Sequence, residues 1–161
     1  MHKLVSMAEL YPMIAETLAA GGCISFTSTG VSMLPMLGDR RDTVTLEPVT
    51  NPIRVNDVVL YRRKGGQFVL HRIVGMESNG DFSLCGDNQF ILEHHISRQQ
   101  MIGRLQSFTH KGHSVFCNST LYKTYVYMLP LLRFLKHGRF IFRRYAAALK
   151  RRIRRLMNEN R

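Results

Sequence analysis

Apolar positions near the N-terminus repeat with the period of a helix. Within residues 7–20, Leu10, Ile14 and Leu18 are spaced four residues apart, so their side chains would share one face of a helix. A Gly-Gly pair follows this segment and favours the end of the helix. We therefore expect a short helical segment over residues 1–21.

After this segment the pattern changes to short runs that are rich in β-branched and aromatic residues. Turn-forming residues such as Gly, Asp, Asn and Pro separate the runs, as expected for strands joined by tight connections. Strand signals dominate up to about residue 109, and the expected strands lie within residues 23–28, 42–49, 57–63, 67–76 and 81–86. Many short strands at close intervals favour an antiparallel sheet. We predict a mainly β fold, coiled or barrel-like, with the β domain over residues 22–118.

A second helical pattern occupies the C-terminal part of the chain. Apolar residues recur there every three or four positions, and Arg and Lys occupy most of the remaining helix surface. The apolar stripe consists of Ile141, Tyr145, Leu149, Ile153 and Leu156. This pattern predicts a basic helical tail over residues 119–161.

The positive charge of the chain is concentrated in this tail. The formal net charge is +12, yet residues 1–122 hold eleven Lys and Arg against ten Asp and Glu. Residues 123–161 hold twelve cations against one acid, Glu159. Such a segment typically binds a polyanionic surface. We favour an anionic membrane surface, contacted by an in-plane helix over residues 139–157, over nucleic acid, because no nucleic-acid-binding module accompanies the tail.

The cysteines and the apolar runs bear on the location of the protein. The three cysteines are widely spaced and odd in number, which argues against a disulfide framework and for a reducing compartment. Two glutamates interrupt the apolar N-terminal run, and the longest apolar run of the tail, YVYMLPLL, is too short to cross a bilayer. We therefore expect a cytoplasmic protein without a signal peptide or transmembrane segment, held at the membrane periphery by its tail.

One polar residue, Ser32, stands within the apolar stretch GVSMLPML. A serine acts as a nucleophile when a neighbouring base takes its proton and N–H groups stabilise the oxyanion. His71 lies in the middle of the strand pattern FVLHRIVG, and an imidazole there could serve as the base. Asp87, in CGDNQ, follows the next expected strand and could orient the imidazole. Each of these residues, taken alone, is more often a structural residue than a catalytic one.

The order of these motifs resembles that of the signal peptidase I superfamily. The chain contains G-x-S-M-x-P around Ser32, then NDVVLY, then H-R-I-V from His71, then G-D-N, over roughly residues 22–105. The resemblance implies a coiled all-β serine peptidase, a fold shared with LexA-type self-cleaving proteins. It assigns Ser32 as the nucleophile, His71 as the base and Asp87 as the acid, as in the histidine-type members. In those members a second acid lies six positions after the aspartate. Here that residue is Glu93, which is the alternative candidate for orienting the imidazole.

The resemblance also indicates how a substrate would bind. Gly30 occupies the position where many signal peptidases have an oxyanion-hole serine, so the Ser32 backbone N–H becomes the expected donor. Met33 and Pro35 are expected to line the substrate groove together with Ser32. A peptide or protein would lie there as an extended strand, and a leader or signal-like segment would be cleaved from it. No cofactor or metal site is expected.

Two other functional classes remain as alternatives. A LexA-type self-cleaving regulator needs a DNA-binding segment and an internal cleavage site, but only about twenty residues precede the β domain. The second alternative is a non-catalytic β module with a membrane- or nucleic-acid-binding tail. Such a module would be free to lose one of Ser32, His71 and Asp87, yet the chain has all three. The peptidase is therefore the preferred interpretation.

Overall fold

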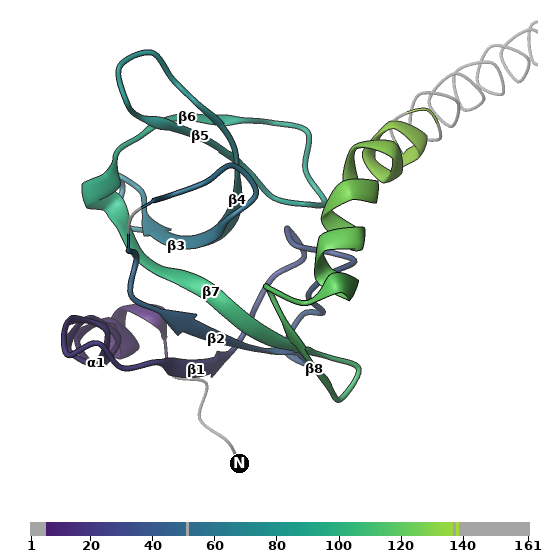
Figure 1. Cartoon of the computed structure of the whole chain (residues 1–161). Coiled ribbons are helices and arrows are strands. Elements are labelled where there is room, and N and C mark those ends of the chain that lie inside the picture. The colour runs from purple at the N-terminus through teal and green to yellow at the C-terminus, as the bar shows by residue number, and fades with distance from the viewer. Residues whose placement is uncertain (1–5, 51, 137, 139–161) are drawn as a thin grey trace, which may run out of the picture. The chain divides into compact units, whose positions relative to one another are not determined.

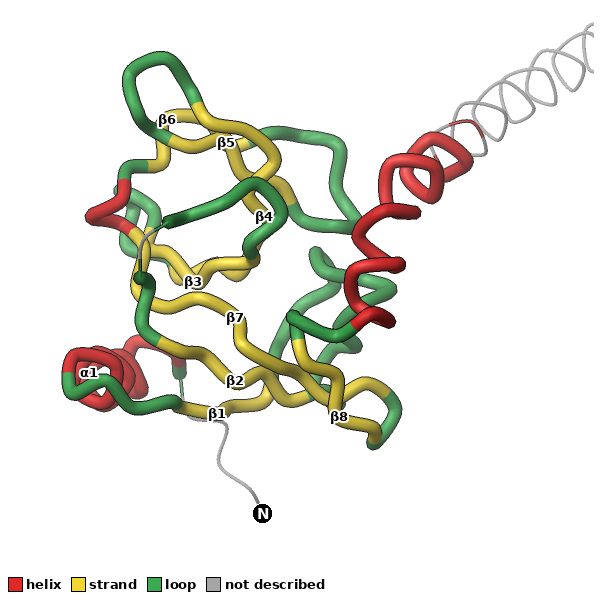
Figure 2. Tube along the Cα trace, viewed as in Figure 1, coloured by secondary structure: helices red, strands yellow, loops and turns green. Residues whose placement is uncertain are grey.

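The structure is mainly β, with a helix toward each end of the chain. The computed structural model describes residues 6–50, 52–136 and 138, and the chain divides into two compact units, Met1–Thr124 and Tyr125–Arg161. The elements are α1 (Met7–Ala19), β1 (Ile24–Thr27), β2 (Thr43–Glu47), β3 (Val58–Arg62), β4 (Phe68–Met76), β5 (Phe82–Cys85), β6 (Glu93–Ile96), the 3-10 turn η1 (Arg98–Gln100), β7 (Met101–His110) and β8 (His113–Phe116). A further helix covers residues 120–136 (Figure 1 and Figure 2). The predicted fold class is thus confirmed.

Strand β7 joins the two halves of the sheet. Within the described residues the strand order is β1-β2-β7-β3-β4-β5-β6, and β8 also pairs with β7. The C-terminal part of β7 pairs with β2, and its N-terminal part pairs with β3, in both cases antiparallel. Register shifts interrupt both pairings, and such bulges bend the strands. The sheet therefore curls, as Figure 1 shows, and its strands surround a common interior.

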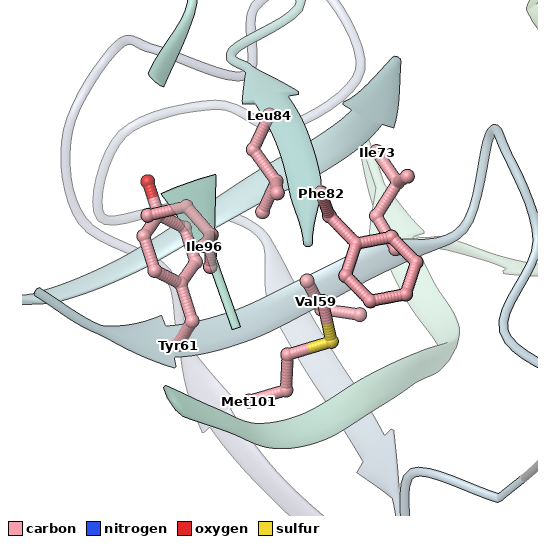
Figure 3. Close-up of a cluster of buried hydrophobic side chains, with 7 residues drawn as sticks. All are labelled: Val59, Tyr61, Ile73, Phe82, Leu84, Ile96 and Met101. Carbon is pink, nitrogen blue, oxygen red and sulfur yellow. The ribbon is translucent and has the colours of Figure 1, made fainter. Parts of the chain in front are cut away.

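A cluster of buried side chains fills this interior (Figure 3). The cluster comprises Val59, Tyr61, Ile73, Phe82, Leu84, Ile96 and Met101. Alternate residues of a strand face the same side of a sheet, which is why Val59 and Tyr61 of β3 both point inward. His71 lies two residues before Ile73 on β4 and therefore belongs to the same inward face. Each buried apolar side chain contributes roughly 1.5–3 kcal/mol to stability.

Helix α1 packs on the sheet through its apolar face. A capping box between Ser6 and Glu9 starts the helix, and Ile14 and Leu18 are buried. Gly103 of β7 leaves the room that this packing needs, because a Cβ there would lie 2.9 Å from Leu18 Cδ1. The N-terminal helix predicted from the apolar spacing is therefore confirmed, and its apolar face lies on β7.

The helix over residues 120–136 exposes many large apolar side chains. They are Leu121, Tyr127, Met128, Leu131, Leu132, Phe134 and Leu135. In the part of the chain that the structure describes, none of the helices combines the length and the apolar character that crossing a membrane requires. The in-plane helix expected over residues 139–157, with its stripe from Ile141 to Leu156, lies outside the described residues.

Candidate active site

Ser32 lies in a turn between β1 and β2, next to the loop that follows β5. Gly30 has a φ of 96°, a left-handed conformation that suits glycine, and its N–H donates to Asp39 Oδ1 at 2.7 Å. The Ser32 carbonyl accepts the Asn88 backbone N–H at 2.7 Å, and the Asn88 side-chain amide donates to the Val31 carbonyl at 2.9 Å. The turn is therefore fixed to the G-D-N loop through its own backbone.

His71 lies at the centre of β4 and is almost fully buried. Its Nδ1 atom lies 3.3 Å from the Tyr61 hydroxyl oxygen and 3.3 Å from Glu93 Oε1. Tyr61 reaches the ring because it pairs with Val69, which faces the same side of β4 as His71. Nδ1 thus has a carboxylate and a phenol within hydrogen-bond reach.

Glu93, the first residue of β6, is held by Arg63. Arg63 Nε donates to Glu93 Oε2 at 2.7 Å, and a second guanidinium N–H donates to Oε1. These charge-assisted bonds lower the pKa of Glu93 below its ordinary value, although burial opposes the shift. Burial and the neighbouring carboxylate raise the pKa of the Tyr61 hydroxyl, which therefore stays protonated. Glu93 is consequently ionised at neutral pH and can accept a hydrogen bond from Nδ1–H.

The second nitrogen of the His71 ring lies close to Gly86, beside the backbone of the Ser32 turn. A Cβ built at Gly86 would lie 3.1 Å from His71 Nε2 and 2.6 Å from the Ser32 carbonyl oxygen. The ring and the turn therefore approach the same point beside Gly86, where only a residue without a side chain leaves them room. The two ring nitrogens therefore have different neighbours, because Nδ1 lies near Glu93 and Nε2 lies near Gly86 and the Ser32 backbone.

The acid at Nδ1 is Glu93, so the expectation that Asp87 fills this position is wrong. Both Asp87 carboxylate oxygens instead accept N–H groups of Arg72, at 2.8 and 2.7 Å, and both side chains are almost completely buried. The physical reason is the alternation along β4: adjacent strand residues face opposite sides, so Arg72 meets the G-D-N loop on the face away from His71. Asp87 therefore ties the loop that carries Gly86 to β4.

A pocket of about 290 Å³ opens beside Ser32 and His71. Apolar side chains from β1, β3 and β4 form much of its wall, and the Ser32 turn closes one side. Ser32 and Met33 line it, and Met33 is buried. Pro35, expected in the groove, is exposed and does not line this pocket.

Sequence reasoning missed Tyr61 and Arg63. Tyr61 could have been found, because alternation along DVVLYRR gives it the same face as Val59, and a hairpin brings that face beside His71. No local signal connects Arg63 with Glu93, which lies 30 residues later in the chain. That pair exists only because the curled sheet brings the end of β3 next to β6.

Among the described residues, no group of three or more His, Cys, Asp or Glu is arranged to hold a metal ion. Comparisons of the chain with protein-family models, with curated proteins and with solved structures return no match. The functional conclusion accordingly depends on the contacts around Ser32 and His71.

Proposed function

We propose that the protein is a serine endopeptidase of signal-peptidase type, which cleaves a leader or signal-like segment from a peptide or protein. The orientation of the His71 ring is the observation that carries this proposal. Its Nδ1 lies 3.3 Å from the Glu93 carboxylate, and its Nε2 lies near Gly86, beside the backbone of the Ser32 turn. This orientation suits a histidine base, which has an acid at one nitrogen and turns the other to the nucleophile.

In the proposed mechanism the Ser32 hydroxyl oxygen attacks the carbonyl carbon of the scissile bond, and His71 Nε2 accepts its proton. The Ser32 backbone N–H stabilises the oxyanion of the tetrahedral intermediate. Nε2–H then protonates the leaving amine, and the same nitrogen activates the water that hydrolyses the acyl-enzyme. Glu93 accepts a hydrogen bond from His71 Nδ1–H and stabilises the imidazolium. Arg63 keeps Glu93 ionised and in position.

The edge of β4 beside the pocket suits an extended substrate. The pairing of β4 with β5 begins at Arg72, and the stretch from Phe68 to Leu70 pairs with β3 along one edge. Phe68, Val69 and Leu70 also line the pocket. A substrate strand that adds to this edge would form backbone hydrogen bonds and carry its scissile bond past His71 and Ser32.

We also propose that the protein works at the cytoplasmic face of an anionic membrane, attached from outside the bilayer. Two features support this. The helix over residues 120–136 exposes large apolar side chains such as Tyr127, Leu131 and Phe134. Residues 123–161 carry twelve cations and one acid. An interfacial helix needs both an apolar surface and basic residues.

Cleavage of a mixed library of extended peptides, with the products identified by mass spectrometry, tests the peptidase. Ser32→Ala and His71→Ala should each abolish cleavage, and the double variant should lose little more, because the two residues act as a unit. Ser25→Ala on β1 and His113→Ala on β8 are matched controls at exposed positions and should retain activity. Full activity in Ser32→Ala would overturn the proposal. Peptide binding without cleavage by the unmodified chain would favour the non-catalytic module.

A further inference from the structure

Helix α1 reaches the pocket beside the proposed catalytic residues. Met7, the first residue of α1, lines this pocket together with Ser32 and His71. One turn further along the helix, the Tyr11 ring lies with its centroid 5.1 Å from that of Phe68, and Phe68 lines the same pocket. The N-terminal helix therefore supplies part of the pocket wall through Met7 and packs against another part, Phe68, through Tyr11.

Side-chain contacts hold α1 beside the pocket. The Arg62 guanidinium lies 6.0 Å from the Tyr11 ring centroid and 5.6 Å from that of Phe68, so one cation contacts both rings. Further along the same face of the helix, Ile14 and Leu18 are buried. Contacts along this face keep α1, and with it Met7, beside the pocket.

The pocket has room for a side chain larger than that of alanine, and part of its lining is apolar. Phe26, Leu37, Leu60 and Phe68 contribute apolar walls along with Met7, while Ser28, Thr29, Arg63 and Gln89 contribute polar groups. The volume of about 290 Å³ is far more than one methyl group occupies. A small side chain would leave the apolar walls in contact with water, whereas a leucine or methionine side chain would cover them.

We infer that α1 is a specificity element of the active site. Met7 forms part of the apolar wall of the pocket, and Tyr11 packs against Phe68, another part of that wall. The pocket thereby selects substrates with a leucine- or methionine-sized apolar side chain next to the scissile bond. This inference rests on the proposed peptidase function. A methionine suits the role because its unbranched, flexible side chain adapts its shape to an apolar partner.

The test compares peptides that differ only in the side chain that enters the pocket: alanine, leucine or phenylalanine. The unmodified protein should cleave the leucine peptide with a kcat/KM about tenfold or more above that of the alanine peptide. Met7→Ala enlarges the pocket and should shift the preference toward phenylalanine, whereas Met7→Trp fills it and should shift the preference toward alanine. Met13→Ala is the matched control, because Met13 lies on the same helix and is 51% exposed.

The same peptides are titrated against Ser32→Ala, alone and combined with each Met7 variant, so that binding is measured without cleavage. Opposite shifts for Met7→Ala and Met7→Trp in either measurement, with none for Met13→Ala, support the inference. If the Met7 variants weaken all peptides equally, or change no ratio, the inference is wrong even while cleavage by the unmodified protein continues. If preferences shift in binding but no variant cleaves any peptide, the pocket assignment holds and the peptidase proposal fails.

Discussion

Glu93 Oε1 lies 3.3 Å from His71 Nδ1, and Arg63 holds this carboxylate through two charge-assisted hydrogen bonds. The other ring nitrogen, Nε2, lies near Gly86, beside the backbone of the Ser32 turn. Asp87 has a structural role, because it forms a buried ion pair with Arg72 on the other face of β4. The two acids should therefore respond differently to substitution.

Glu93→Gln should reduce catalysis and leave the fold intact. The amide keeps the shape of the side chain but removes the charge that stabilises the imidazolium. We expect kcat to fall about 10²–10⁴-fold, the usual contribution of a positioned acid–base system. Glu16→Gln, at an exposed position of α1, is the matched control and should leave kcat unchanged. Equal kcat for Glu93→Gln and the unmodified protein would show that this carboxylate has no part in the reaction.

Asp87→Ala should destabilise the fold. The substitution leaves Arg72 charged and buried without its carboxylate partner, a change that typically costs about 3–5 kcal/mol. The free energy of unfolding in urea measures this effect. The double variant Arg72→Met with Asp87→Leu should recover much of the loss, because it removes both charges. If Asp87→Ala unfolds at the same urea concentration as the unmodified protein, the ion pair does not stabilise the fold.

Gly86→Ala should impair the site by steric conflict. The added Cβ would lie 2.6 Å from the Ser32 carbonyl oxygen, which belongs to the backbone and moves only if the turn moves. We expect a large fall in kcat, because a displacement of about 1 Å at a nucleophile costs about 100-fold in rate. Gly65→Ala is the control, since its Cβ meets only the Gln67 side-chain oxygen at 3.7 Å. Retained activity in Gly86→Ala would mean that the described approach of turn and ring is wrong.

The Arg63–Glu93 pair should make stability depend on pH in the acid range. The pKa of Glu93 in the folded protein is lowered from its ordinary value of 4.5, mainly by Arg63. The unfolded chain therefore binds the proton more tightly, so the stabilisation is present above pH 4.5 and is lost as the pH falls through the folded pKa. Arg63→Met removes the main cause of the shift.

Urea unfolding at a series of acid pH values measures this dependence. The free energy of unfolding of the unmodified protein should fall more steeply on acidification than that of Arg63→Met. Lys64→Met, at the neighbouring exposed position in the hairpin turn, should behave like the unmodified protein. Parallel curves for the Arg63 variant and the unmodified protein would contradict the prediction.

The C-terminal region should attach the protein to anionic membranes. Flotation with vesicles that contain phosphatidylglycerol should recover the full chain, and vesicles of phosphatidylcholine should recover less, because each cation near an anionic surface contributes about 1 kcal/mol. Leu131→Glu should weaken the association about tenfold or more through loss of apolar burial. Gln99→Glu, an exposed substitution that adds the same charge to the β unit, should have little effect. Equal recovery of all proteins with both kinds of vesicle would exclude this attachment.

Several elements could be predicted from local patterns. The apolar spacing of Leu10, Ile14 and Leu18 indicated α1, and alternating β-branched and aromatic runs indicated β1 to β5 close to their observed bounds. The bounds of β6, β7 and β8 did not follow from the sequence. β6 is the four-residue segment EHHI, which has a single strongly apolar residue. β7 pairs with β3 in its N-terminal part and with β2 in its C-terminal part, so its bounds depend on those strands. Such elements acquire their form from pairing rather than from their own composition.

The sequence by itself determined the kinds of element, their order and two candidate residues, Ser32 and His71, because periodicity and turn chemistry act between neighbours in the chain. Only the tertiary structure decided that Glu93 meets the imidazole, that Arg63 holds Glu93, and that Met7 lines the pocket. These relations depend on the register of β3 with β4 and on the closure of the sheet through β7. Contacts between residues 30 or more positions apart are set by that closure, which no local pattern encodes.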